Sequence, residues 1–537
     1  MTTNPKAPNV ASTISVAERV RSTVIFWLCA IVLVASLVLG GGTRAGFLSD
    51  VLLQWSAIPL VIALLWRSGS SQRSGRFAVI LCSLVVLVPA LQLVPLPPAL
   101  WSHLPMRDVV VAAFDLTRLS LPWMPLSVSP SATWVSALSL IPPVALFVGV
   151  RRLDVQARRR LSLVLIGIGL MSVLLGLLQI AQGPTSPLRL FEFTNPSEAV
   201  GFFANRNHFA ALLFSALLFA AAWVLNLSSN TPSNTAGLDA KAIGLRLLGA
   251  TVLIAFIAGE LMARSRAGLG LTMLALLGVA FLPVLRAQHG PSATRIIVGV
   301  ALVTLLLATQ FVLYRIFERF GLDPLDDARV DLATTTIQAA KAFMPWGSGM
   351  GTFVPVYQLF ERREELAPSY ANHAHNDVLE LWLEAGVVSF LLMGLFALWF
   401  FARSFDVWRR QHSAHALDLS LARAASLVIV LLIAHSLVDY PLRTGAMMAV
   451  FAFSCALLVR APERGDEHET SSRSRHAAGR RPPPIPTGRE ARVSVDAAHA
   501  NLGPETETRQ QVPAKAHERW GEDVAWPEAW RNPPKDR

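Results

Sequence analysis

The sequence is poor in charged residues. Of its 537 residues, 15% are Asp, Glu, Lys or Arg, whereas ordinary soluble domains contain about 25%. Hydrophobic residues make up 53% of the chain, and they gather in long uninterrupted runs instead of at the spacing of amphipathic elements. This distribution excludes a soluble multidomain protein.

Cysteine is scarce as well. Cys29, Cys82 and Cys455 each fall inside an apolar run. Their spacing gives neither a disulfide framework nor a zinc-binding set. We expect them to be small buried side chains.

The amino-terminal region lacks the pattern of a cleavable signal peptide. Its first apolar run, 23–39, follows Arg19 and Arg21 and ends in Gly40-Gly41-Gly42, with no small-x-small cleavage site before a soluble domain. The pattern predicts an anchor that remains as the first membrane helix.

What the sequence has in abundance is apolar runs of about 20 residues, the length that a helix needs to cross ~30 Å of hydrocarbon. The segment 97–132 is rich in Pro and Trp and predicts an interfacial loop. We therefore predict an all-α, polytopic integral membrane protein of about twelve transmembrane helices, at 23–41, 51–66, 77–96, 133–150, 161–181, 208–227, 243–263, 268–285, 296–314, 386–402, 424–438 and 444–459.

The formal net charge of +11 comes from arginines between the apolar runs. The alternate short loops that include 151–160 and 403–410 are arginine-rich, and the loops between them are sparser. This positive-inside bias predicts that both termini are cytoplasmic and argues against nucleic-acid binding. By parity, the long loop 315–385 is periplasmic.

The chain divides into two predicted parts. Residues 1–460 form the transmembrane domain, with its motif-bearing core at about 200–445. Residues 461–537 contain Arg480-Arg481-Pro482-Pro483-Pro484 and many Ser, Glu and Ala residues. Such a composition cannot bury enough apolar surface to offset chain entropy, so we expect a disordered cytoplasmic tail.

Ionisable groups cluster in the predicted outward loops, and each is a functional candidate because such groups are costly at membrane depth. They are Arg264, Arg266, Arg329 and the ionisable residues of the segments Asn372–Asp377 and His435–Arg443, and the glycine run Gly347–Gly351 lies among them and is a further candidate.

Each candidate also has a structural interpretation. The arginines can snorkel at helix ends, the glycines can form an ordinary turn, and His435 can pair with Asp439 on one helical face. His373, His375 and Asp377 can bind a metal ion, but no Cys or Glu-x-x-His pattern accompanies them.

Taken together, the groups suit one kind of chemistry. Guanidinium groups match the oxygens of a diphosphate bidentately. A histidine at a helix start suits a general base, because the positive end of the helix dipole disfavours the imidazolium form. The pattern favours displacement of a lipid diphosphate by a sugar hydroxyl.

At these residues the sequence resembles the O-antigen ligase and polymerase superfamily of bacterial envelope glycosyltransferases. His375-Asn376, nine residues and then Gly386 are similar to the family's histidine motif. The family has Gly, Thr or Tyr three residues after that glycine, and here Ser389 stands instead. Supporting matches lie at Phe202–His208, Ser265-Arg266, Arg329, Gly347–Gly351 and His435–Arg443.

The resemblance implies an inverting transferase without metal or other cofactor, acting at the periplasmic face of the inner membrane. The donor would be an undecaprenyl-diphosphate-linked glycan, and the acceptor lipid A-core or another glycan. His375 would be the base, and Arg266 and Arg329 would hold the diphosphate. Secondary substrate contacts would come from Arg264, Asn376, Asp439 and Arg443.

Two alternatives remain open at this stage. Ligase and polymerase activities are not separated by the sequence. A transporter or flippase of lipid-linked saccharides also needs many helices and basic residues, but it would place charges along a cavity in mid-helix, whereas these charges lie at helix ends.

Overall fold

The computed structural model describes residues 10–44, 46–66, 76–229, 240–284, 324–362, 370–410 and 416–461, with the isolated positions 299, 303, 306 and 309. The chain has two compact units, 1–467 and 468–537. The predicted tail lies outside the described residues, apart from its first position.

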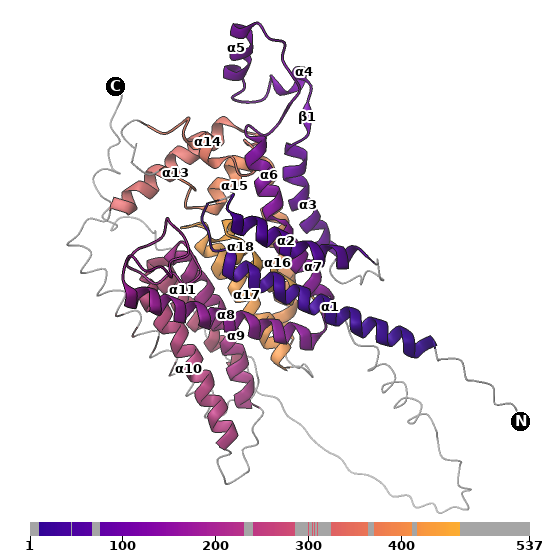
Figure 1. The fold of residues 1–537 in the computed structure, drawn as a ribbon, viewed down its shortest axis with the longest axis vertical. Helices are drawn as coiled ribbons and strands as arrows, with labels where there is room; N and C mark the ends of the chain where they lie inside the picture. Colours follow the sequence, from indigo (N-terminus) through magenta and orange to yellow (C-terminus); the bar gives the residue numbers. More distant parts are fainter. Residues whose placement is uncertain are drawn as a thin grey trace, which may run out of the picture. The chain divides into compact units, whose positions relative to one another are not determined.

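The described chain is mostly helical (Figure 1). Among the described residues, eight helices are long and apolar enough to cross a membrane, and three shorter apolar helices accompany them. Apart from 296–314, which lies largely outside the described residues, every predicted span coincides with one of these helices. The elements that form this part of the fold are α1 (Val10–Leu39), α2 (Leu48–Leu65), α3 (Arg76–Gln92), α6 (Pro130–Ser139), α7 (Ile141–Arg152), α8 (Val155–Gln182), α9 (Arg206–Ser229), α10 (Ala240–Ala263), α11 (Arg266–Val284), α16 (Val387–Arg409), α17 (Ala416–His435) and α18 (Gly445–Leu458).

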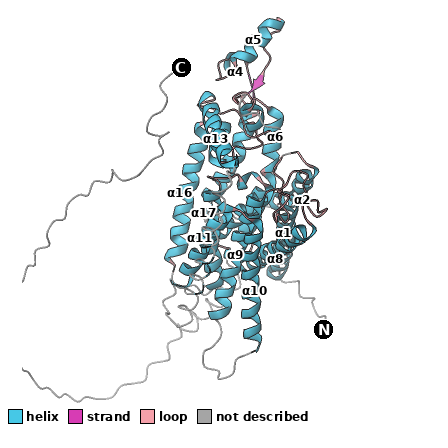
Figure 2. Ribbon diagram, turned by 90° about the vertical axis from the view of Figure 1, so that its left-hand side faces the viewer, coloured by secondary structure: helices cyan, strands magenta, loops and turns pink. Residues whose placement is uncertain are grey.

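Helix α9 is the most enclosed of the apolar helices. It packs against α10, α11 and α17, and these helices run beside one another in Figure 2. Its alanines, from Ala210 to Ala222, are almost fully buried. Small side chains let neighbouring backbones approach closely, which is how membrane helices gain packing energy.

The triglycine after α1 joins three helices at one end of the bundle. A Cβ on Gly41 would lie 2.1 Å from the Phe202 carbonyl oxygen, and one on Gly40 would lie 2.6 Å from the Ala446 nitrogen. The carbonyls of the two glycines accept bonds of 3.0 Å from the N–H groups of Ala204 and Ala446. Only glycine permits this approach, which brings the end of α1 to the starts of α9 and α18.

The described parts of the predicted long loop contain three helices. They are α13 (Pro324–Ala342), α14 (Phe353–Tyr357) and α15 (Asp377–Ala385). Phe343, Phe353 and Leu383 are buried together in a hydrophobic cluster of their own. Burial of these side chains explains why the segment is ordered.

The segment predicted as an interfacial loop, 97–132, is more structured than we expected. It contains α4 (Pro98–Trp101), α5 (Asp108–Thr117) and the strand β2 (Met124–Pro125), which pairs antiparallel with β1 (Pro95–Leu96). The all-α prediction is therefore right for the bundle but misses this small sheet.

Arginines gather at the opposite end of the bundle from the triglycine. Arg158 donates to the Val459 carbonyl at 2.6 Å, Arg152 to that of Leu64 at 2.9 Å, and Arg403 to that of Leu458 at 2.7 Å. Each carbonyl lies at a helix carboxyl end, where a positive charge is favoured. The arginine-rich loops 151–160 and 403–410, which the structure describes, thus share one end of the bundle.

We predict that this arginine-rich end faces the cytoplasm. In a variant without native cysteines, a single cysteine at Val155, at the start of α8, should resist an impermeant thiol reagent in intact spheroplasts. A cysteine at Val330, which is 65% exposed at the opposite end, should react. Labelling at position 155 and not at position 330 would contradict the predicted orientation and place the arginine-rich end outside the cytoplasm.

Candidate active site

His375 occupies an unusual backbone position. Its φ angle is +48°, in the left-handed region that residues with a Cβ rarely adopt. Asn376 follows as the N-cap of α15. Non-glycine residues are held in this region only when surrounding contacts over-determine it, and such positions concentrate at functional sites.

The His375 side chain is paired with a buried carboxylate. Its Nδ1 atom lies 3.1 Å from Oδ1 of Asp439, which is fully buried, while the His375 side chain is 27% exposed. Nε2 of His375 forms no hydrogen bond with the described part of the chain. The pair therefore anchors one ring nitrogen of His375 and leaves the other without a hydrogen bond to a described residue.

A hydrogen-bond relay holds Asp439 from its other side. Asn207 Nδ2 donates to Asp439 Oδ2 at 2.6 Å, and Ser265 Oγ donates to Asn207 Oδ1 at 2.8 Å. Ser265 Oγ also accepts the Gly268 N–H at 3.0 Å at the start of α11. The relay links the first turns of α9 and α11 to His375.

The electrostatics of this relay favour the ionised form of Asp439. Burial alone would raise the pKa of the Asp439 carboxyl, but the hydrogen bond with His375 and the neighbouring imidazoles outweigh it and hold that pKa well below its usual range. The ionised carboxylate accepts the Nδ1 proton, so Nε2 of His375 carries the lone pair. This is the arrangement that a general base requires.

His373 has a different environment from His375. Its Nδ1 atom lies 2.9 Å from Oε1 of Glu380, and its Nε2 atom lies 3.1 Å from the carbonyl oxygen of Thr43. Both ring nitrogens are therefore engaged. The rings of His373 and His375 both contact Tyr440, with centroid distances of 4.3 and 4.8 Å.

The two histidines thus turn Nδ1 toward different carboxylates. Asp377 is engaged elsewhere, since its Oδ2 atom accepts a bond of 2.6 Å from Ser436 Oγ. Within the described ranges, no group of three or more His, Cys, Asp or Glu side chains is arranged to hold a metal ion.

Arg443 lies at the centre of a carboxylate cluster. Its guanidinium lies 2.6 Å from Glu384, 3.4 Å from Glu380 and 3.5 Å from Asp377. Burial opposes ionisation of Glu380, but the charges of Arg443 and His373 hold its pKa at about 2, whereas burial raises the pKa of Asp377 to about 7. Arg443 thereby ties η2 (Pro441–Arg443) to α15.

The side chain of Asn376 is occupied by local structure. Its Oδ1 atom accepts the N–H groups of Val378 and Leu379 at 3.0 Å, and its Nδ2 atom donates to the Leu437 carbonyl at 2.9 Å. Asn376 therefore starts α15 and joins it to the chain after α17, which positions the preceding His375.

The glycine run 347–351 wraps around the end of α15. The N–H of Gly349 donates to the Glu384 carbonyl at 3.0 Å, and that of Gly351 donates to Oε1 of Glu384 at 2.8 Å. A Cβ on Gly347 would lie 2.5 Å from the same carbonyl oxygen. These N–H groups serve packing instead of forming a phosphate cradle.

Gly386 and Ser389 shape the turn from α15 to α16. Gly386 has a φ angle of +54°, and a Cβ there would lie 2.1 Å from the Pro345 carbonyl oxygen. Ser389 Oγ donates to the Gly386 carbonyl at 2.6 Å. The hydroxyl at position 389 therefore stabilises the turn that ends the histidine motif.

The predicted arginines differ in their positions. Arg264 is exposed in the turn before α11 with a φ angle of +50°, and Arg266 is the half-buried first residue of α11. Arg266 directly follows Ser265 of the relay. Arg329 is half-buried in α13, and its positive charge interacts electrostatically with His435. The His435 carbonyl accepts a hydrogen bond of 2.9 Å from the Asp439 N–H.

Two further histidines lie around Asp439. His208 and His435 are fully buried, and neither ring forms a hydrogen bond with a described residue. His208 Nε2 lies 4.0 Å from Asp439 Oδ1. The predicted His435–Asp439 pair is joined through the backbone rather than through its side chains.

Sequence reasoning gave no role to several residues of the site. Asn207 lies in the Phe202–His208 motif, but no sequence pattern pairs it with Asp439, and none singles out Thr43 or Arg44. The triglycine was the available signal for this region, because consecutive glycines indicate close backbone approach.

Part of the chain matches a known protein family. Residues 249–394 match the family model described as O-antigen ligase, which confirms the resemblance found in the sequence. No curated protein matches the chain. The match begins in α10 and ends in α16, so it includes Arg264, Arg266, Arg329, His375 and Asn376.

Proposed function

Because residues 249–394 match the O-antigen ligase family, we propose that this protein transfers glycan from undecaprenyl diphosphate to an acceptor hydroxyl. The observation that carries the proposal is the His375–Asp439 pair, with Nε2 of His375 available to a substrate. We place this reaction at the periplasmic face of the bacterial inner membrane, in a domain of about twelve spans over residues 1–460, with residues 461–537 as a cytoplasmic tail.

In the proposed reaction, Nε2 of His375 takes the proton from the acceptor hydroxyl while the hydroxyl oxygen bonds to the anomeric carbon of the donor. The bond from that carbon to the diphosphate breaks on the opposite side, so the configuration inverts. Asp439 stabilises the imidazolium ion that forms on His375. The proton on Nε2 of His375 then passes to solvent.

The leaving lipid diphosphate takes the bonding electrons and needs stabilising positive charge. We assign this role to Arg266 and Arg329, whose planar groups match phosphate oxygens. Their fixed charges make a divalent cation unnecessary in the proposed reaction. We assign a supporting role to Arg264, which lies in the same turn as Arg266.

Purified protein in detergent micelles tests the proposal, because micelles have no second compartment. A transferase should convert lipid-linked donor and acceptor into product there. A transporter of lipid-linked saccharides would give no product in micelles but would move the donor across the bilayer of liposomes, and that result would replace the proposal.

In the same assay, Arg266→Lys and Arg329→Lys should each lower the transfer rate by about one to two decades. Lysine keeps the charge but loses the bidentate fork, and a charge-assisted hydrogen bond contributes roughly 1.5–3 kcal/mol. Arg118→Lys, at an exposed arginine outside the site, is the matched control. Wild-type rates in both test variants would leave only a snorkelling role for these arginines.

A further inference from the structure

The two partners of the site come from separate segments of the chain. His375 directly precedes Asn376, the N-cap of α15, and Asp439 lies in the segment 436–442, which runs from the end of α17 into η2. The 3.1 Å contact between His375 Nδ1 and Asp439 Oδ1 therefore depends on how these two segments are held against each other.

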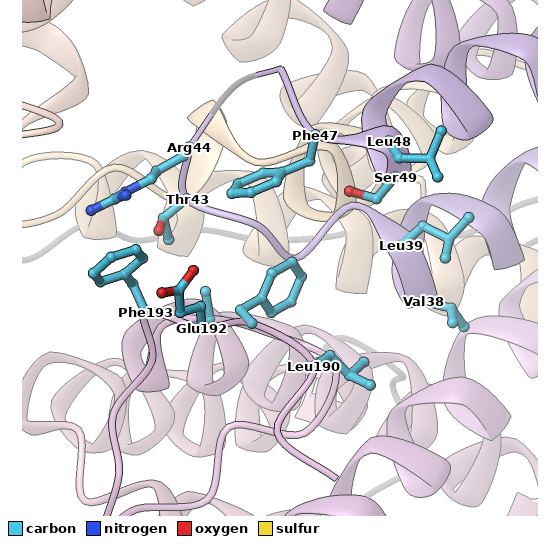
Figure 3. Close-up of a pocket in the computed structure, with 12 residues that line it drawn as sticks. Val38, Leu39, Thr43, Arg44, Phe47, Leu48, Ser49, Leu190, Glu192 and Phe193 are labelled. Atoms are coloured by element: carbon cyan, nitrogen blue, oxygen red, sulfur yellow. The ribbon is translucent and has the colours of Figure 1, made fainter. Parts of the chain in front are cut away.

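The turn between α1 and α2 holds the chain before His375. The Thr43 carbonyl accepts a hydrogen bond of 3.1 Å from His373 Nε2. The guanidinium carbon of the neighbouring Arg44 lies 3.7 Å from the ring centroid of Phe193, and Figure 3 shows both side chains. These contacts hold the histidine side of the pair, and the position of the carboxylate depends on what holds the segment 436–442.

Asp377 holds both ends of the segment 436–442. Its Oδ2 atom accepts a hydrogen bond of 2.6 Å from Ser436 Oγ and one of 3.2 Å from the Leu442 N–H. The Asp377 N–H also donates to the Ser436 carbonyl at 2.9 Å. Ser436 and Leu442 each lie three positions from Asp439, so one carboxylate oxygen closes a loop that has Asp439 at its middle.

The strength of these bonds depends on the charge of Asp377. A hydrogen bond to an ionised acceptor is about twice as strong as one between neutral groups. The second oxygen, Oδ1, forms no hydrogen bond with a described residue and lies 3.5 Å from Nε of Arg443. A proton on Oδ1 would face a guanidinium group, which can only donate, so protonation weakens the ion pair with Arg443 as well as the two bonds to Oδ2.

The charged groups around Asp377 determine when it ionises. Arg443 faces it from η2, Glu380 from its own helix and His373 from the segment before that helix. Helices α13 and α14 pack on α15 through the separate hydrophobic cluster. Burial raises the pKa of Asp377 to about 7, although the charge of Arg443 and the hydrogen bond from Ser436 oppose it. The carboxyl therefore changes its charge within the pH range of ordinary transfer assays.

We propose that the ionised Asp377 is a positioning residue, which holds Asp439 against His375, and that transfer slows when Asp377 takes up a proton. Its carboxylate is buried and acts through the segment 436–442 instead of touching substrate. Transfer is thereby reduced when the medium at this face of the membrane becomes acidic. The inference rests on the proposed transferase function and adds a residue that controls its general base.

The test is the pH dependence of kcat in micelles at saturating donor and acceptor. We expect wild-type kcat to fall about tenfold through a step near pH 7, as the weakening of a charge-assisted contact requires. Asp377→Asn keeps the shape of the neutral acid, so above that pH its kcat should be about tenfold below that of the wild type, with both KM values unchanged. The step should be absent from this variant, whereas any effect of protonating His375 is common to both proteins.

Two further variants separate this role from a merely structural one. Ser436→Ala removes one hydrogen bond to the carboxylate and keeps its charge, so the step should move upward by about one pH unit. Glu384→Gln is the matched control, because it removes a buried carboxylate that pairs with Arg443 at 2.6 Å, and it should keep the step. Each kcat is expressed per folded molecule, so that a loss of stability does not count as a loss of rate.

A step that persists in Asp377→Asn, or one that stays at the same pH in Ser436→Ala, would overturn the inference, and normal wild-type transfer would then leave the proposed function intact. Loss of the step in Glu384→Gln alone would assign the ionisation to Glu384 and also overturn it. If the wild-type protein transferred no glycan at any pH, the proposed function itself would fail, and the inference with it.

Discussion

Replacement of His375 with alanine is expected to lower glycan transfer by about two decades or more while donor binding is retained. A positioned general base contributes about 10²–10⁴-fold to a rate. The Nε2 atom of His375 is the ring nitrogen that faces away from Asp439, and the side chain is partly exposed. The measurement is the transfer rate in micelles at saturating donor and acceptor.

His373→Ala is the matched comparison, because the two histidines pack on the same tyrosine ring. His373 connects Glu380 to the Thr43 carbonyl, so its loss should reduce stability more than the rate per folded molecule. Near-normal transfer by His375→Ala, together with a His373→Ala variant that is folded but inactive, would assign the general base to His373 instead of His375.

Asp439→Asn is expected to lower transfer by about two to four decades. Ser265 orients the Asn207 amide so that its NH₂ group faces residue 439. An asparagine at 439 must turn its carbonyl to Asn207 and its own NH₂ group to His375. Nδ1 of His375 then becomes an acceptor, and Nε2 keeps its proton and cannot act as a base.

The double variant Asn207→Asp with Asp439→Asn tests this explanation. A carboxylate at 207 accepts the NH₂ group of residue 439, which turns its carbonyl back to Nδ1 of His375. We expect the double variant to regain about a decade of the lost rate, since the tautomer is restored but the negative charge on residue 439 is not. A double variant slower than Asp439→Asn would contradict the relay.

The membrane helices could be predicted because they depend on composition over long runs. About 20 consecutive apolar residues suffice for a span, and alternation of arginines divides the loops into two groups. In the structure Arg152, Arg158 and Arg403 occupy one end of the bundle, as that alternation requires. The structure of the segments 97–132 and 315–385 is harder to predict from the sequence. Their short helices bury only a small hydrophobic cluster, so the sequence contains no long apolar run that would indicate them.

The site was only partly predictable, because its contacts join distant positions. The motif singled out His375, but its partner Asp439 lies 64 positions away, and Asn207 lies 232 positions from Asp439. Arg443 was expected to contact substrate, yet it is surrounded by carboxylates of α15, and Asn376 caps that helix. A sequence shows that a residue is polar and near a membrane surface, but not which neighbour forms its hydrogen bonds or ion pairs.

The proposed reaction depends on Nε2 of His375, which removes the acceptor proton during attack on the donor. The most direct measurement is single-turnover transfer by His375→Ala and wild-type protein that have been saturated with the same lipid-linked donor in micelles. We expect equal amounts of bound donor in the two proteins, release of lipid diphosphate with glycan transfer in the wild type, and transfer slower by about two decades or more in the variant. Equal single-turnover rates for the two proteins would contradict this role of His375.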